Sequence, residues 1–114
     1  MKIKIAVPSK GRISEPSINI LEKAGLGLKD RESRKLISKT FNKDIDVLFA
    51  RASDIPEFVQ DGIADIGITG IDLIKESEAD VIELLDLKFG KTKEKILMND
   101  YLHILYKVVM NLKI

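Results

Sequence analysis

The amino-acid sequence predicts an α/β domain built as a three-layer sandwich, with helices on both faces of a largely parallel sheet. Short apolar runs typical of buried strands alternate with segments in which apolar residues recur at helical spacing. At 114 residues, the chain has room for one domain with one hydrophobic core. These two observations favour a single α/β unit.

The first part of the chain predicts a strand, a helix and a second strand. A strand over residues 3–7 leads into a helix that we expect Ser14 to cap with its hydroxyl. Gly25 ends this helix, because glycine readily takes the left-handed conformation found there. Residues 27–34 are polar and predict a loop, and alternation over residues 35–40 predicts a strand.

The stretch RASDIPEFVQDGIADIGITGID, from Arg51 to Asp72, organises the rest of the chain. It follows a buried strand predicted over residues 45–50. Ser53 or Asp54 can cap a short helix, which Gly62 would end.

Four further elements complete the prediction. The apolar run over residues 63–68 predicts a buried parallel strand, residues 71–77 a helix and residues 81–87 a fifth strand. The tail over residues 101–114 predicts a helix capped by Asn99 or Asp100, with an apolar face made of Leu102, Leu105, Val108, Val109 and Leu112. We expect this tail to pack on the same domain or on a partner chain, and a homodimer would bury two such tails.

Composition limits the classes of partner. Lys and Arg total 19 against 18 Asp and Glu, a net charge of +1, which gives no case for a nucleic-acid or membrane surface. Cysteine is absent, so disulfides and thiolate chemistry are excluded, and a cytoplasmic chain fits this usage. No apolar stretch approaches the ~20 residues that a membrane helix needs.

Polar residues follow three predicted strands at the ends where open α/β sheets bind their ligands. Basic side chains there could clamp phosphates, and backbone N–H groups at Gly70 and beyond could meet an anion or a ribose hydroxyl. The candidate nucleotide-binding residues are Lys10, Gly11, Arg12, Arg51, Asp54, Thr69, Gly70 and Asp72. We find no candidate catalytic residue and no metal-ligand spacing.

Each candidate has a structural alternative. Lys10 and Arg12 could be a solvated basic turn, and Arg51 could pair with Asp54 or Asp72 instead of a ligand. Asp54 could act first as a helix cap, and Asp72 could do no more than stabilise a helix N-terminus. The hydroxyl of Thr69 could donate to a phosphate or close a turn.

Several segments together carry a family resemblance. The pattern RxxDIPxxVxxGxADxGITGxD in the organising stretch is accompanied by IAVPSKGR at residues 5–12, LEKAGL at residues 21–26 and LLDLKFG at residues 84–90. These segments resemble the first lobe of ATP phosphoribosyltransferase over about residues 1–93. The resemblance implies the first lobe of a two-lobed, type II periplasmic-binding-protein-like fold.

The resemblance also implies a reaction. In this family, N1 of the adenine of ATP displaces pyrophosphate from C1 of phosphoribosyl pyrophosphate, the first step of histidine biosynthesis. Mg²⁺ would enter with the substrate, and ATP or AMP would bind the candidate residues. Phosphoribosyl pyrophosphate would bind only in an intact two-lobed enzyme.

After Lys93 the resemblance ends in our interpretation. The family would continue with an apolar strand into a second lobe, whose phosphate loop we do not find among the 114 residues. We therefore expect a truncated first lobe that is inactive alone. The alternative is a non-catalytic α/β domain that binds a nucleotide weakly, or only folds and dimerises.

Overall fold

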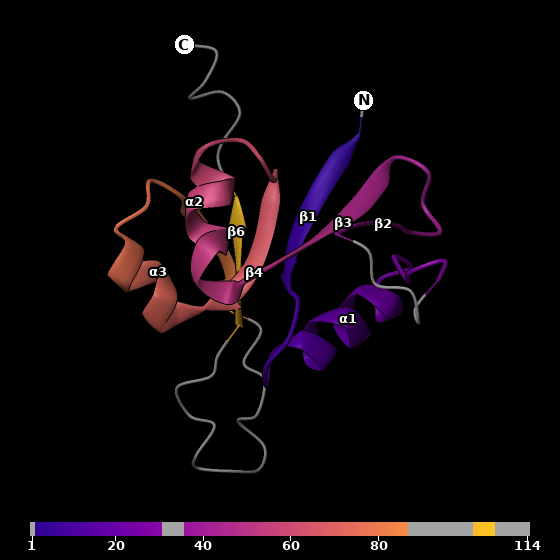
Figure 1. The fold of residues 1–114 in the computed structure, drawn as a ribbon, viewed down its shortest axis with the longest axis horizontal. Helices are drawn as coiled ribbons and strands as arrows, with labels where there is room; N and C mark the ends of the chain where they lie inside the picture. Colours follow the sequence, from indigo (N-terminus) through magenta and orange to yellow (C-terminus); the bar gives the residue numbers. More distant parts are fainter. Residues whose placement is uncertain (1, 31–35, 87–101, 107–114) are drawn as a thin grey trace.

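A mixed sheet runs through the centre of the molecule in the computed structural model, which describes residues 2–30, 36–86 and 102–106 (Figure 1). The described strands form a six-stranded sheet in the order β2-β3-β1-β4-β6-β5. The strands are β1 Ile3–Pro8, β2 Ile37–Lys39, β3 Ile45–Ala50, β4 Ile66–Gly70, β5 Ile82–Asp86 and β6 Leu102–Tyr106. The helices are α1 Ser14–Lys23, α2 Ile55–Gln60 and α3 Ile71–Ser77, and a 3₁₀ turn over Ala52–Asp54 precedes α2.

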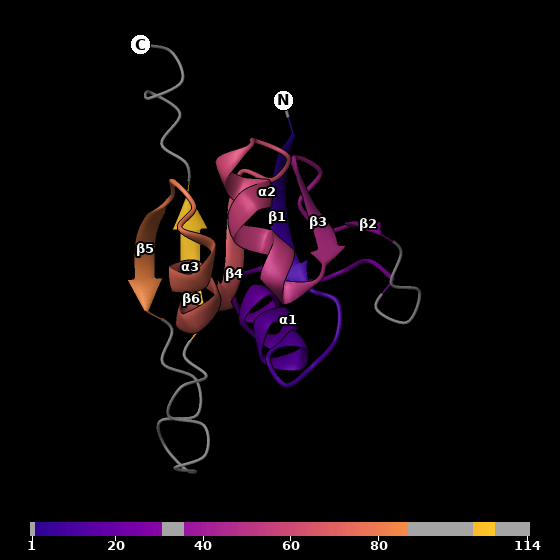
Figure 2. The ribbon, with the colours of Figure 1, turned by 60° about the vertical axis from the view of Figure 1, so that its left-hand side comes forward.

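Four of these strands share one direction. Strand β1 pairs in parallel with β3 and β4, whereas β6 runs antiparallel to both β4 and β5, so β5 has the direction of β4. Only β2 and β6 run the opposite way within the described sheet. The prediction of a largely parallel sheet is confirmed. In Figure 2, β5 and β6 lie beyond β4, at the opposite end of the sheet from β2.

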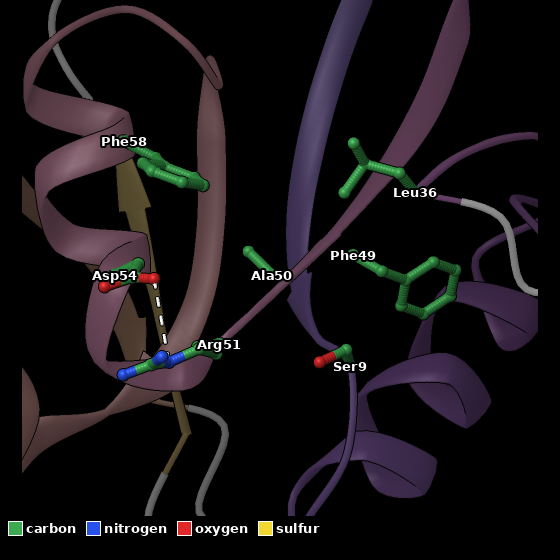
Figure 3. A pocket seen from close by; sticks show the side chains of 7 residues that line it. All are labelled: Ser9, Leu36, Phe49, Ala50, Arg51, Asp54 and Phe58. Carbon is green, nitrogen blue, oxygen red and sulfur yellow. Dashed lines mark ion pairs between the residues drawn. The ribbon is translucent and has the colours of Figure 1, made fainter.

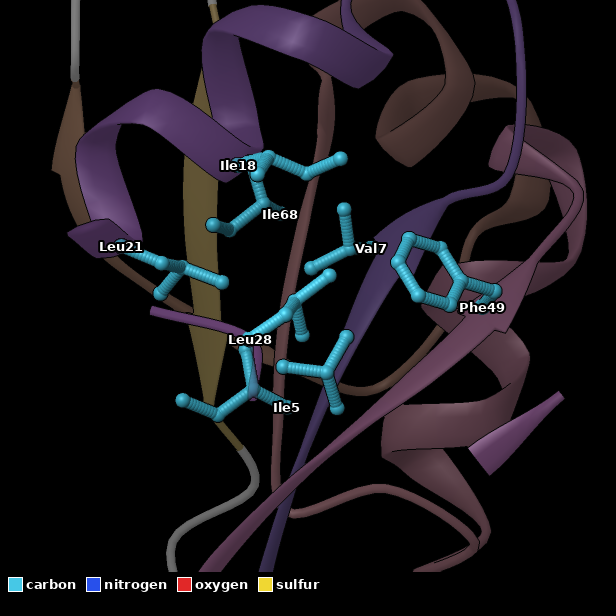
Figure 4. Packing of buried hydrophobic residues seen from close by; sticks show 8 residues of the cluster. Ile5, Val7, Ile18, Leu21, Leu28, Phe49 and Ile68 are labelled. Carbon is cyan, nitrogen blue, oxygen red and sulfur yellow. The ribbon is translucent and has the colours of Figure 1, made fainter. Parts of the chain in front are cut away.

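Alternation along β1 and β3 divides the core into two clusters, as expected for side chains that point to opposite faces of a sheet. On one face, strand residues such as Ile5 and Val7 pack with Ile18 of α1 (Figure 4). On the other face, Ala6 and its neighbours pack against α2, and Ile74 of α3 joins them. The three-layer arrangement is therefore confirmed.

The helix predicted for the tail is wrong for residues 102–106, which form β6. The strand lies between β4 and β5, with Gly70 opposite Leu102 and Ile66 opposite Tyr106. A helix at this position would leave the backbone N–H and C=O groups of β4 unpaired along one edge, whereas an inserted strand pairs them. We expected the chain to depart from the family after Lys93, where the family continues with an apolar strand; β6 shows that a strand does follow. The remaining tail residues and the predicted caps Asn99 and Asp100 lie outside the described residues.

Glycine ends the two helices where the sequence predicted. Helix α1 stops at Lys23, and Gly25 follows with φ of +85°. The N–H of Leu26 then donates to the carbonyl of Leu21 at 2.8 Å, which closes the helix end. Gly62 has φ of +81° after α2.

The predicted side-chain caps are wrong. Ile13, not Ser14, precedes α1, and its carbonyl accepts from the Ser17 hydroxyl at 2.6 Å. The Ser14 hydroxyl is buried without a hydrogen-bond partner. At α2 neither Ser53 nor Asp54 caps with its side chain. A 3₁₀ turn precedes this helix, and backbone carbonyls accept from its N–H groups: the Asp54 N–H donates to the Arg51 carbonyl at 2.9 Å, and the Ile55 N–H donates to the Ala52 carbonyl.

Strand β4 begins at Ile66, later than the predicted residue 63. The N–H groups of Ile63 and Ala64 both donate to the carbonyl of Phe58, at 2.9 and 3.1 Å. These two bonds close the end of α2 and delay the strand.

Close approach of α2 to β4 depends on Gly67. A Cβ at this position would lie 2.5 Å from Cγ2 of Ile55 and 2.9 Å from Cγ2 of Val59. Both side chains are fully buried, so they cannot move aside without disturbing the core. The absence of a side chain at Gly67 therefore sets the position of α2.

We predict that Gly67→Ala lowers the free energy of unfolding by roughly 1–3 kcal/mol, the usual effect of overpacking a core. Urea denaturation followed by circular dichroism measures the change. Gly27→Ala is the matched control, because its Cβ would meet nothing closer than 3.4 Å. Equal losses in the two variants would contradict this account of the α2 position.

Candidate functional site

The candidate site lies at the carboxyl edge of the parallel strands. Pro8 at the end of β1 lies opposite Ala50 at the end of β3. The N–H of Ser9 donates to the Ala50 carbonyl at 2.8 Å, which carries the pairing one residue further. The loop that begins at Ser9 and the residue Arg51 therefore leave the sheet side by side.

The basic loop after β1 faces solvent. Lys10, Gly11 and Arg12 are all exposed. Gly11 has φ of +97°, a conformation that glycine adopts without strain, and its carbonyl accepts from the Ser14 N–H at 3.2 Å. The turn thus presents two cationic side chains at the edge of the sheet.

Arg51 pairs weakly with Asp54. Nε of Arg51 lies 3.9 Å from Oδ2 of Asp54, and the two side chains are 77% and 45% exposed. An exposed pair at this distance contributes little to stability. The sequence left open whether Arg51 pairs with Asp54 or with Asp72, and in the structure it pairs with Asp54. The guanidinium group of Arg51 stays accessible to solvent.

Thr69 lies beneath the edge rather than on it. Its side chain is fully buried, and its hydroxyl donates to the Ala52 carbonyl at 3.0 Å. The structure therefore assigns Thr69 to closing the turn over the 3₁₀ segment. Gly70 immediately precedes α3 in an extended conformation, and Asp72 is exposed in the first turn of that helix.

An open hollow of about 490 Å³ lies beside Arg51 (Figure 3). Its lining comes from the ends of β1 and β3, from the start of α2 and from the residue before β2: Ser9, Leu36, Phe49, Ala50, Arg51, Asp54 and Phe58. The sequence identified Arg51 and Asp54 among these residues. It missed the apolar lining, although the four-residue spacing of Asp54 and Phe58 places both on one helical face.

Charged side chains of both signs lie at this edge. Lys10 and Arg12 are exposed in the loop after β1, and Arg51 and Asp54 line the hollow. Such an arrangement suits phosphate groups, which an arginine can bind through two parallel hydrogen bonds.

Within the described ranges, no group of three or more His, Cys, Asp or Glu side chains could bind a metal ion. Within the same ranges, no helix has the length and apolar character needed to cross a membrane.

Comparisons with known proteins agree on one family. The family model described as ATP phosphoribosyltransferase matches residues 51–107. An ATP phosphoribosyltransferase of Methanothermobacter thermautotrophicus is 66% identical over 91 residues, which cover 80% of this chain and 32% of the relative. One from Methanosarcina barkeri is 63% identical over 90 residues, 78% of this chain and 31% of the relative. The chain thus spans about a third of the length of these relatives.

A solved structure supports the same fold. A chain of the ATP phosphoribosyl transferase (HisG:HisZ) complex from Thermotoga maritima superimposes with a TM-score of 0.63 and 31% sequence identity. The superposition covers 74% of this chain and 39% of that one. The family match also continues to residue 107 and includes β6, so it extends past Lys93, where our interpretation of the sequence ended the resemblance.

Proposed function

This chain belongs to the ATP phosphoribosyltransferase family, and from this premise we propose that its sheet edge binds ATP for phosphoribosyl transfer. In the proposed reaction, N1 of adenine forms a bond to C1 of phosphoribosyl pyrophosphate, and the bond from C1 to the pyrophosphate oxygen breaks. Phosphoribosyl-ATP and pyrophosphate leave as products.

One observation carries this proposal: the register of β1 and β3. The pairing of Pro8 with Ala50, continued by the bond from Ser9 to Ala50, brings the basic loop next to Arg51. Two segments that carry cationic side chains thus leave the sheet at the edge where α/β sheets bind their ligands. These groups can neutralise the triphosphate of a nucleotide, and the family resemblance implies that ATP, not phosphoribosyl pyrophosphate, binds to this lobe.

Each exposed candidate has a proposed role. Lys10, Arg12 and Arg51 neutralise phosphate oxygens, with the guanidinium groups donating pairs of hydrogen bonds. Asp54 and Asp72 accept hydrogen bonds from ribose hydroxyls, and the N–H of Gly70 donates to the same ligand. The hydroxyl of Thr69 donates a hydrogen bond to the Ala52 carbonyl and so stabilises the turn that carries the exposed residues.

Charge develops on the ribose and on the departing pyrophosphate as the bond at C1 breaks. Mg²⁺ that enters with the phosphorylated substrate would neutralise part of the leaving group. The chain's own contribution is to bind and orient ATP so that adenine N1 faces C1, and no covalent enzyme intermediate is required. Positioning of two reactants can account for roughly 7–11 kcal/mol of barrier lowering.

Phosphoribosyl pyrophosphate is proposed to bind to a second lobe, as the resemblance implies, and not to this edge. The residues described at the edge would hold one of the two reactants only. We therefore propose that these 114 residues without a second lobe bind ATP but do not form product.

Association with other chains and a cytoplasmic location are also part of the proposal. The solved relative from Thermotoga maritima belongs to a complex. This chain exposes large apolar side chains at the β2 end of the sheet, including Ile37 and Phe41, which are 45% and 69% exposed. A homodimer would cover such residues.

Isothermal titration calorimetry of the 114-residue chain tests the proposed function. We expect measurable binding of ATP or AMP and much weaker binding of phosphoribosyl pyrophosphate, because the edge would bind the nucleotide only. Tighter binding of phosphoribosyl pyrophosphate would contradict the assignment. Failure to bind either ligand would favour the non-catalytic alternative.

We predict that Arg51→Ala weakens ATP binding at least tenfold while the free energy of unfolding changes by less than about 1 kcal/mol, as for an exposed ion pair. Calorimetry and urea denaturation measure the two effects. Lys43→Ala removes an exposed cation from the turn before β3, at the other edge of the sheet, and should leave ATP binding unchanged. A large loss of stability in Arg51→Ala would instead give Arg51 a structural role.

A further inference from the structure

We propose that the adenine base rests on the ring of Phe58, which makes this side chain a determinant of base recognition. The inference rests on the proposed function, because it concerns the ligand of the same edge. It adds a residue that neither the sequence patterns nor the cationic edge identified.

The position of Phe58 follows from α2. Asp54 immediately precedes α2 and Phe58 lies within it, four residues later, so the two side chains project from the same side of this segment. Both line the hollow, and Figure 3 shows the Phe58 ring on the α2 side with Asp54 between it and Arg51. A ribose on Asp54 would carry its base toward Phe58 and its phosphates toward Arg51.

Phe58 is only partly buried, although its side chain packs against the core cluster under α2. The packed side of the ring fixes its orientation, and the remaining surface faces the hollow. A preoriented aromatic ring loses little conformational entropy when a base covers it. A flat purine also covers exposed apolar area, which favours binding.

The hollow has one apolar part and one charged part. Ala50 lies on the same face of the sheet as Phe58, and Leu36 and Phe49 add further apolar lining, whereas Arg51, Asp54 and Ser9 form the polar part. Its volume of about 490 Å³ lies in the range of small-molecule sites. A ligand with an apolar ring at one end and phosphates at the other matches this division.

The test uses two probes, ATP and inorganic tripolyphosphate, which share the phosphate chain but differ in the nucleoside. We expect Phe58→Ala to weaken ATP binding roughly 5- to 150-fold, the usual range for removing one base–aromatic contact. Tripolyphosphate binding should not change, because the phosphates would contact the cationic edge. Phe58→Leu keeps the packing against the core, and it should weaken ATP binding by a smaller factor.

Phe41→Ala is the matched control, because it removes an exposed phenylalanine that does not line the hollow. It should leave the affinity for both probes unchanged. Circular dichroism of each variant verifies folding, and Phe58→Leu decides the question if Phe58→Ala does not fold.

The outcomes separate the two proposals. Equal weakening of ATP and tripolyphosphate in a folded Phe58 variant, or no change for ATP, would overturn the role of Phe58 and leave the proposed function intact. Unmodified chain that binds neither probe would overturn the proposed function itself, and with it this inference.

Discussion

The register between β1 and β3 is the constraint on which the rest of the site depends. Six residue pairs align from Ile3 with Ile45 to Pro8 with Ala50, and the bond from Ser9 to the Ala50 carbonyl extends the pairing beyond the strands. A shift of one residue would turn the core residues of one strand to the opposite face. Burial of Val7 and Val47 on one face and Ala6 and Leu48 on the other therefore fixes where Lys10 and Arg51 leave the sheet.

A second constraint places the other wall of the hollow. Gly67 allows Ile55 and Val59 to approach β4 more closely than any side chain would permit, so α2 lies directly against the sheet. The buried hydroxyl of Thr69 bonds the turn that precedes this helix. Together they set the position of the helical face that carries Asp54 and Phe58, and core packing thus shapes the exposed site.

Local signals in the sequence were enough for most elements. The apolar runs predicted strands β1 and β3, and the glycines predicted the ends of α1 and α2. These features depend on residues close together in the chain, and the predictions are confirmed. The tail was not predictable in this way, because residues 102–106 suit a helix or a buried strand equally well. Pairing with β4 decides between them, and that pairing links residues far apart in the chain.

The candidate site also has features that local sequence patterns predict and features that depend on residues far apart in the chain. The sequence predicted that Lys10 and Arg51 each follow the carboxyl end of a strand, and the parallel pairing of β1 with β3 puts both strand ends at one edge of the sheet. The burial of Thr69 and the apolar lining from Leu36 and Phe58 depend on sheet order and helix packing, which local patterns do not contain. Tertiary structure therefore converts a set of strand-end residues into a hollow with a charged part and an apolar part.

The central claim is that ATP binds at the carboxyl edge of the sheet, between the basic loop and α2. Titration of isotope-labelled protein with ATP, followed by amide chemical shifts, tests it most directly. The account predicts saturable shifts concentrated at Ser9–Arg12 and Arg51–Phe58, with the turn over residues 42–44 at the other edge of the sheet unaffected. Shifts centred on that turn, or spread evenly over the surface, would contradict it.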